Sequence, residues 1–213
     1  MSSAQPQARR AYQSSRRRQQ AAETRSAVLD SATRVFGERG WAATGMRDVA
    51  RESGVSVETV YAYFGSKSDL LLAAIDVAVV GDAEPVPLAR RDVFAALGQG
   101  SREERMQAAA RLVTDIHRRT AGVNLALREA AASDPELDRV MREREDGRRA
   151  NVEEGLSLVV GHPVTEQQAD ALWAVLDIGV YRMLTDLRAW APQQYQDWLA
   201  GALDRLLDGG RCD

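Results

Sequence analysis

Apolar residues recur every three or four positions along most of this chain, the spacing that places them on one face of an α-helix. In the N-terminal third this pattern predicts helices at about 24–39, 46–53 and 57–64, and a fourth that begins near 66 and ends near 80. The sequence lacks runs of alternating apolar and polar residues with the β-branched bias of strands. We therefore expect an all-α fold.

The rest of the chain predicts a second helical unit. The segment from Gly81 to Pro87 contains two prolines and is interpreted as a linker, because proline cannot continue a helix. Further helices are expected at about 91–97, 102–120, 123–132, 134–160, 165–190 and 193–207. We expect an arm at 1–23, a DNA-binding domain at 24–68 whose fourth helix links onward to about 80, and a helical effector-binding and dimerisation domain at 81–213.

Residues 46–64 have the layout of a helix-turn-helix. Gly54 stands between the two helices and permits the positive φ that a tight turn needs. Ser56 is placed to cap the following helix through its hydroxyl. That helix is only two turns long, which is typical of a helix that lies in the DNA major groove. The segment therefore predicts a DNA-binding unit.

Several side chains of this unit are candidates for DNA contact. Serine and threonine hydroxyls can reach a phosphate or a base edge, and tyrosine rings suit the sugar-phosphate wall. A lysine at the start of the fourth helix would add its charge to the free N–H groups of that helix end, a favourable phosphate site. The alternative role for each residue is support of the three-helix core. The candidates are Arg47, Ser56, Glu58, Thr59, Tyr61, Tyr63 and Lys67.

A dense, ungapped set of residues between 25 and 72 matches one known family. The matching residues are Phe36, Gly40, Thr44, Met46-Arg47-Asp48-Val49-Ala50, Gly54-Val55-Ser56, Thr59, Tyr61, Tyr63-Phe64, Ser66-Lys67 and Leu70. This segment resembles the DNA-binding domain of TetR-family transcriptional regulators. Gly45 departs from the family pattern, which usually has Ser or Thr there to cap the second helix, so we expect that cap to be missing.

The resemblance implies a homodimer that binds double-stranded DNA. Such proteins typically dimerise through two C-terminal helices as a four-helix bundle, and a small-molecule effector in the second domain releases a repressor from a palindromic operator. The apolar stripes on the last two predicted helices agree with that arrangement, since a helix that is apolar on more than one side must bury both sides. The candidate dimer residues are Leu172, Leu176, Val180, Leu199 and Leu203.

Charge is distributed unevenly along the chain. Residues 1–67 contain ten arginines and Lys67 against six acidic residues, a net charge of +5, whereas residues 68–213 carry −8 and the whole chain −3. A basic head on an acidic body fits one domain that faces phosphates and another that faces a different ligand.

Residues 1–23 form a separate basic piece that we interpret as a flexible arm, because it is rich in Gln, Ser, Ala and Arg and nearly free of large apolar side chains. Either the arm adds phosphate or minor-groove contacts beside the reading helix, or it is a solubilising tail. Deletion of residues 1–20 distinguishes the two, since a tail would leave the DNA affinity and its salt dependence unchanged.

Polar and aromatic residues on the predicted body helices are candidates for an effector pocket. Trp173, Asp177 and Tyr181 are spaced by four and would line one stripe of a single helix. An aromatic wall with a few polar groups suits a small molecule. The alternative is that these residues belong to the core, an interface or the surface. Candidates from other helices are His117, Asn124 and Arg128.

The sequence offers little support for catalysis. Its two histidines, His117 and His162, are far apart, and no nucleophile motif, P-loop or dinucleotide fingerprint occurs. The glutamates between Glu143 and Glu154 lack the Glu-x-x-His spacing of a metal site in a helical bundle, and we interpret them as a solvated face. We expect no enzyme activity, cofactor or metal. An enzyme on the helical domain and a DNA-binding protein without an effector are the alternatives.

Two further features bound the class of protein. The single cysteine, Cys212, excludes a disulfide framework or a cysteine metal site within one chain. No apolar stretch reaches the ~18 residues of a membrane span, and no apolar segment follows the N-terminal arginines as in a signal peptide. The default expectation is a cytoplasmic protein without a membrane partner.

Overall fold

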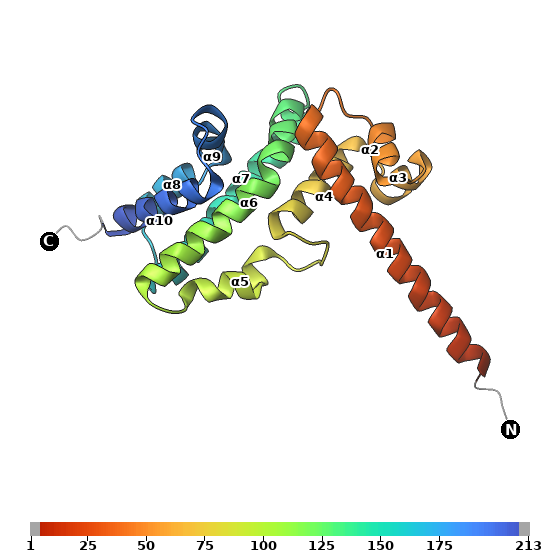
Figure 1. The fold of residues 1–213 in the computed structure, drawn as a ribbon, viewed down its shortest axis with the longest axis horizontal. Coiled ribbons are helices and arrows are strands. Elements are labelled where there is room, and N and C mark those ends of the chain that lie inside the picture. The colour runs from red at the N-terminus through yellow and green to blue at the C-terminus, as the bar shows by residue number, and fades with distance from the viewer. Residues whose placement is uncertain (1–4, 209–213) are drawn as a thin grey trace.

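A computed structural model describes residues 5–208 of the chain and the side chains of residues 16–208 (Figure 1). This part is all-α, as predicted, and residues 5–208 contain no strand. None of its helices combines the length and the apolar character that crossing a membrane requires. The α-helices are α1 (Gln5–Arg39), α2 (Met46–Ser53), α3 (Val57–Phe64), α4 (Lys67–Val80), α5 (Asp92–Ala95), α6 (Arg102–Ala131), α7 (Pro135–Val160), α8 (Glu166–Val175), α9 (Ile178–Arg182) and α10 (Pro192–Asp208).

Three short segments complete the helical structure. Two are 3-10 turns on either side of α5, η1 (Leu88–Arg90) and η2 (Ala96–Gly98). The third, η3 (Met183–Leu187), is a π-helix that follows α9 directly. Cys212 lies outside the described residues.

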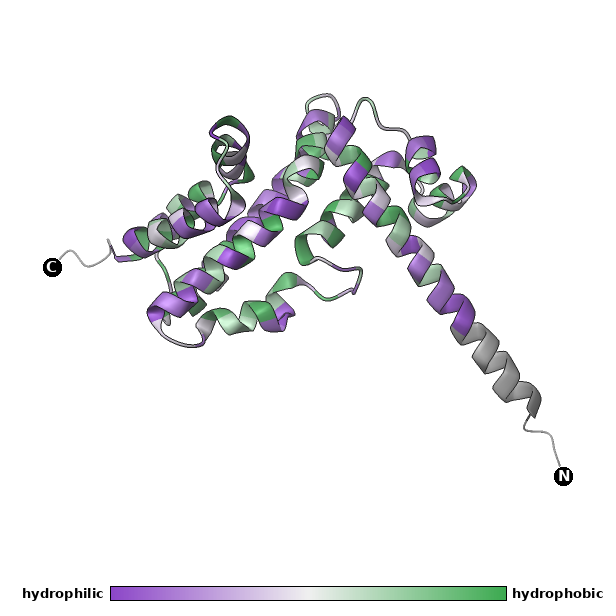
Figure 2. Cartoon of the chain, in the orientation of Figure 1, coloured by the Kyte–Doolittle hydropathy of each residue, from purple (hydrophilic) through white to green (hydrophobic). Residues whose placement is uncertain are grey.

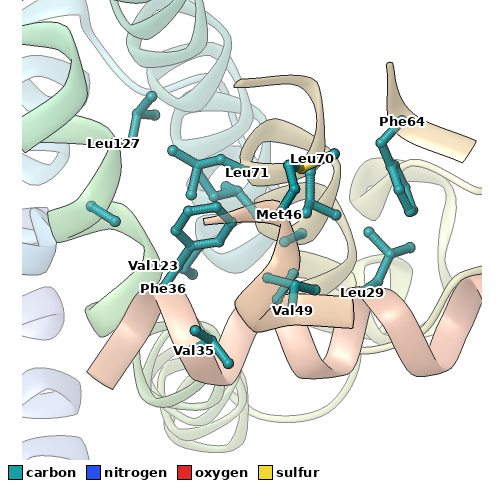
Figure 3. Close-up of a cluster of buried hydrophobic side chains, with 14 of the residues drawn as sticks. Leu29, Val35, Phe36, Met46, Val49, Phe64, Leu70, Leu71, Val123 and Leu127 are labelled. Carbon is teal, nitrogen blue, oxygen red and sulfur yellow. The ribbon is translucent and has the colours of Figure 1, made fainter. Parts of the chain in front are cut away.

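Helices α1 to α4 form the head of the molecule. Their apolar faces meet in a core in which Phe36, Leu70 and Leu71 are completely buried (Figure 3). Val123 and Leu127 of α6 belong to the same cluster, so the head is not a separate unit but packs directly on α6. This continuity joins the predicted helix-turn-helix to the second half of the chain.

Helices α5 to α10 form the body. The long helices α6 and α7 lie side by side and carry α10 and α8 on their outer faces (Figure 1). The body has its own core, and Leu172, Tyr195, Leu199 and Leu203 are completely buried in it. The body therefore rests on a framework of two long helices, one of which also supports the head.

The first helix begins much earlier than predicted. The sequence pattern placed its start near Thr24, whereas α1 begins at Gln5 and its N-terminal part projects away from the body (Figure 1). The apolar pattern does not extend this far. The backbone is helical because Ala, Gln, Arg and Glu are good helix formers and the buried part of α1 already provides the nucleus.

The helix α6 is continuous where the sequence predicted two helices, at 102–120 and 123–132. Gly122, which lies between those two ranges, is inside α6 at its crossing with α1. A Cβ atom on Gly122 would lie 2.6 Å from Cα of Gly37, so this glycine permits a close approach of two helices.

The helix predicted at 165–190 is broken into α8, α9 and η3. The break comes at Leu176 and Asp177, where the Asp177 carboxylate accepts a hydrogen bond from the Gly179 N–H at 2.6 Å and caps a new helix. An aspartate at this position competes with the regular helical hydrogen bonds, which the apolar periodicity cannot reveal.

Candidate functional site

The turn between α2 and α3 holds the two helices at a defined angle. Gly54 has φ of 70°, and the Val55 N–H donates to the Ala50 carbonyl at 3.1 Å. The Ser56 hydroxyl accepts from the Thr59 N–H at 3.2 Å and lies 3.0 Å from the Thr59 hydroxyl. Ser56 therefore caps α3 as predicted, and its oxygen and that of Thr59 stand together at the start of the candidate reading helix.

The start of α2 is held without a side chain at the cap position. Gly45 offers none, and the Asp48 carboxylate instead accepts from the Gly45 N–H at 2.9 Å. This backbone hydrogen bond, together with the Arg51 guanidinium, holds the pKa of Asp48 below its ordinary value. The missing cap is thus replaced from within the helix, and the N-terminus of α2 is already partly neutralised by a carboxylate.

The predicted DNA-contact residues differ in how open they are. Arg47, Ser56, Glu58 and Tyr61 are exposed, and half of the Tyr61 surface (51%) is accessible. Thr59 and Tyr63 are half-buried, and the Tyr63 hydroxyl donates to the Ala21 carbonyl of α1 at 3.3 Å.

Lys67 has an internal role that the sequence did not indicate. Its Nζ donates to the Trp41 carbonyl at 2.5 Å and lies 3.9 Å from the centroid of the Trp41 ring. Partial burial lowers the pKa of Lys67, although Glu129 opposes that effect. The prediction of a lysine that projects freely toward phosphate is therefore corrected, because the ammonium group braces the α1–α2 loop.

Two side chains of helix α6 form hydrogen bonds with the head. The Glu129 carboxylate accepts from the Trp41 N–H at 2.7 Å and from the Ala42 N–H at 3.1 Å, which fastens the α1–α2 loop. Arg119 donates to the Ala78 and Val79 carbonyls at 2.7 and 2.9 Å, which fastens the end of α4. The sequence analysis missed both contacts, since they join residues at least 40 positions apart and no local pattern marks them.

A cavity of about 730 Å³ lies behind the head, between α4, α6, α7 and the segment 82–88. Helix α4 is predominantly hydrophobic (Figure 2). So is the chain around α5, which also contributes to the cavity wall. The predicted effector residues that line the cavity are His117, Asn124, Arg128 and Asp177.

Trp173 and Tyr181 do not line the cavity. Because the helix breaks at Leu176 and Asp177, the four-residue spacing no longer places them on one face with Asp177. Trp173 lies under the Arg148 guanidinium, 5.0 Å from the ring centroid. Tyr181 packs edge-on against Tyr195 at 4.9 Å.

His117 belongs to the cavity wall and to a buried aromatic cluster. Its Nδ1 lies 3.2 Å from the Tyr195 hydroxyl, and its ring lies 5.4 Å from that of Tyr181. Burial lowers the pKa of His117 to about 4 and raises that of Tyr195. Both groups are therefore uncharged near neutral pH, and His117 ties α6 to α10.

Several cavity residues were missed because α7 was interpreted as solvated between Glu143 and Glu154. Arg144, Glu145 and Arg148 line the cavity from this helix. The Arg148 Nη1 donates to the Trp173 and Leu176 carbonyls at 3.1 and 3.3 Å. These are carbonyls that the break after α8 leaves without helical partners, so Arg148 could be assigned only after the break was known.

The predicted dimer residues are mostly buried inside the chain. Leu172, Leu176, Leu199 and Leu203 lie in the body core, and only Val180 is half-buried. Their apolar stripes therefore face the body itself, and the prediction that these four leucines meet a partner is wrong. Large apolar side chains that are exposed on α6 and the C-terminal helices are Leu125 (45%), Met183 (59%), Leu187 (76%) and Leu206 (39%).

Comparisons with known proteins agree with this geometry. Residues 28–74 match the family model for bacterial regulatory proteins, tetR family. The HTH-type transcriptional regulator BetI of Rhizobium meliloti is 47% identical over 51 residues, which are 24% of this chain and 25% of BetI. A TetR-family structure from Streptomyces coelicolor is 27% identical, with a TM-score of 0.60 over 86% of this chain and 98% of that one. The multidrug binding protein EbrR complexed with ethidium is 28% identical, with a TM-score of 0.54 over 86% and 98%.

The two kinds of similarity cover different parts of the molecule. Sequence similarity to BetI spans a quarter of that protein (25%), whereas similarity in fold to the solved structures covers 86% of this chain. Residues 28–74 form a TetR-type DNA-binding domain, and the chain as a whole resembles TetR-family transcriptional regulators.

Proposed function

We propose that this chain, which carries a TetR-type DNA-binding domain, is a dimeric repressor that a small molecule releases from a palindromic operator. The observation that carries the proposal is the joining of a helix-turn-helix to a cavity of about 730 Å³ through α4 and α6, which belong to both. Binding to the chromosome implies that the protein acts in the cytoplasm.

The DNA-reading surface is built around α3. Arg47, Ser56, Glu58 and Tyr61 are exposed on α2, the turn and α3, and Thr59 stands beside the Ser56 hydroxyl. An arginine can bind a guanine edge or a phosphate, and a hydroxyl can bind either a base or a phosphate. Tyr63 contributes its ring edge, and Lys67 acts mainly by holding Trp41 in place.

The basic start of α1 adds a second DNA-facing element. Arg16, Arg17 and Arg18 are exposed on the part of α1 that projects from the body (Figure 1). We assign this segment to phosphate contacts beside the operator half-site, since a run of arginines raises affinity regardless of sequence.

Release by an effector would run through α6 and α4. A ligand in the cavity touches Ile75 and Val79 of α4 and Ile116 of α6. Helix α6 in turn holds the α1–α2 loop through Glu129 and the end of α4 through Arg119. A ligand that favours one arrangement of these helices changes the separation of the two reading heads in a dimer.

The dimer is assigned to the C-terminal helices through residues other than those predicted. Met183 and Leu187 of η3 are exposed (59% and 76%), and Val180 is half-buried beside them. A twofold dimer presents two α3 helices to half-sites about one DNA turn apart, ~34–36 Å. A DNA-binding protein that acts only through a protein partner would not need the cavity.

The decisive experiment is selection of duplexes from a random pool at two salt concentrations, followed by titration of the selected site. We expect a palindrome bound at least about a thousandfold more tightly than random DNA, with an affinity that falls steeply with salt. Arg47→Gln should weaken that binding, whereas the matched Arg139→Gln on the exposed face of α7 should not. No enrichment at either salt concentration would contradict the proposal.

A further inference from the structure

The cavity wall is charged, but nearly every charge already has an opposite partner in the chain. Arg144 pairs with Asp76 at 2.7 Å, and Arg148 pairs with Glu145 at 2.7 Å. The remaining pairs are Arg128–Asp177 at 2.9 Å and Asp82–Arg91 at 2.6 Å.

Two lining charges lack an ion-pair partner among residues 16–208, and they differ in sign. The Arg25 guanidinium lies over the Phe64 ring, 5.3 Å from its centroid. Glu84 is exposed in the segment between α4 and η1. Because the two charges are opposite, they do not together give the cavity a charge of one sign. Water can also solvate the exposed Glu84 carboxylate.

An ionic ligand would have to disturb one of these pairs. An anion that takes Arg128 leaves Asp177 without its closest cation, and a cation that takes Asp76 leaves Arg144 unpaired. A charge left unpaired at a partly buried site opposes binding, because its desolvation is no longer offset. The internal pairing therefore disfavours ligands of either sign.

The remaining wall offers apolar surface and uncharged polar groups. His117 is buried, and its Nδ1 already meets the Tyr195 hydroxyl at 3.2 Å. Asn124 uses one N–H on the Thr120 carbonyl at 3.2 Å, and its amide oxygen has no partner among the residues that the structure describes. The apolar lining includes Leu112, Val113, Ile116, Leu127, Met141, Val152 and Leu156.

We propose that the cavity takes an uncharged, largely apolar molecule, and that Asn124 orients it by hydrogen-bonding its polar end. This inference rests on the proposed effector role of the cavity and specifies the class of molecule. It sets this chain apart from EbrR, whose structure holds ethidium, an organic cation.

The test uses three probes with the same ten-carbon tail: decan-1-ol, decanoate and decyltrimethylammonium. Their affinities for the full chain are measured calorimetrically at neutral pH, without DNA and below micelle-forming concentrations. Decan-1-ol is expected to bind at least about tenfold more tightly than either ion. Equal or tighter binding of an ion, or no binding of any probe, would overturn the proposal.

Two substitutions and one control variant locate the probe. Val113→Trp narrows the cavity and should weaken binding of decan-1-ol, whereas Val93→Trp, on an exposed residue outside the lining, should not. Asn124→Ala should weaken the binding of decan-1-ol by several-fold, which is about the effect of losing one hydrogen bond. Unchanged binding to the Val113→Trp protein would place the probe elsewhere and overturn the assignment.

A third variant tests the physical reason for neutrality and does not depend on filling the cavity. Asp177→Asn frees Arg128 while keeping a residue that can cap α9. Decanoate should then bind at least about fivefold more tightly than to the parent protein, and decan-1-ol should change less than twofold. No gain for decanoate would contradict the pairing argument.

Release of the selected operator by the same probes separates this inference from the proposed function. If decan-1-ol binds in the cavity while the operator complex persists at saturation, the ligand class stands and the proposed regulation fails. If decanoate or the ammonium probe binds best and releases the operator, the regulation stands and the ligand class is overturned.

Discussion

The head and the body of this molecule differ in how tightly their helices pack. In the head, short helices close on a core in which Phe36, Leu70 and Leu71 have no exposed surface. In the body, α6 and α7 are long and support a cavity of about 730 Å³ between them and α4. The proposed function accounts for this difference, because a head that reads DNA must keep one shape and a body that takes a ligand must keep space.

Both regions combine local and long-range polar contacts. In the head, Ser56 and Ser66 accept from N–H groups three residues later, and Lys67 reaches Trp41 across 26 positions. In the body, Arg139 pairs with Glu136 within one turn, and Arg128 reaches Asp177 across 49 positions. In each region the caps and same-turn pairs can form within one helix, whereas the long-range contacts form only after the helices have met.

The largest expected effect comes from truncating one leucine in each region. Leu71→Ala removes a fully buried side chain from the solid core and should lower the free energy of unfolding by about 3–5 kcal/mol. Leu112→Ala trims a half-buried cavity wall that already borders empty space, so its cost should be about half as large. Urea unfolding of both variants measures the difference, and equal costs would contradict the contrast between head and body.

The buried histidine should make the body sensitive to acid. His117 has a pKa lowered from 6.5 to about 4, so the native state stays neutral while the unfolded chain takes up a proton. His117 therefore has no effect on the free energy of unfolding above pH 6.5. Its effect lowers that free energy as the pH drops toward 4, by about 3 kcal/mol in total.

The His117 contribution is isolated by comparing variants in urea unfolding across this pH range. His117→Gln should remove the slope between pH 6.5 and 4 that exceeds the general effect of carboxylates. His162→Gln is the control, since His162 is exposed and the slope should persist. An unchanged slope in the His117→Gln protein would sink the assignment.

The crossing of α1 and α6 has no room for even a single added methyl group. Gly122→Ala would place Cβ 2.6 Å from Cα of Gly37, and the helices must move apart at a cost of about 1–3 kcal/mol. Gly147→Ala is the matched control within α7, where nothing lies within 4 Å of the added Cβ. That change should stabilise by about 0.5–1 kcal/mol, because alanine favours helix. Thermal unfolding of both proteins checks the opposite signs.

The smallest expected effect concerns the link between the regions. Glu129→Gln keeps the size of the side chain but removes the charge that strengthens its hydrogen bonds to Trp41 and Ala42. We expect operator affinity to fall by about 1 kcal/mol, or several-fold, with little change in unfolding. Glu136→Gln alters an exposed pair on α7 and should leave affinity unchanged. Equal affinities would show that the loop needs no support from α6.

Sequence reasoning worked best where structure is locally encoded. The bounds of α2 and α3, the Gly54 turn and the Ser56 cap were all predicted, because each depends on residues within one or two helical turns. Arg47 and Tyr61 were candidates for DNA contact, and both are exposed. The apolar spacing also predicted the all-α class of the described residues.

The same reasoning failed where a residue acts through a distant partner. Two helices were predicted at 102–120 and 123–132 where α6 is continuous, while Asp177 was assigned to a continuous helix and instead caps a new one. Lys67 was expected to face phosphate and instead holds Trp41.

By itself, the sequence determined the all-α class and the bounds of α2 and α3, because periodicity, caps and turn glycines act over a few residues. Only the tertiary structure decided which apolar stripes face the body's own core, where the cavity lies and how its charges pair. Those outcomes depend on contacts such as Arg128–Asp177 and Glu129–Trp41, which join residues 49 and 88 positions apart. Such contacts exist only once packing has brought the helices together. A pattern along the chain does not say how far apart two helices lie in space.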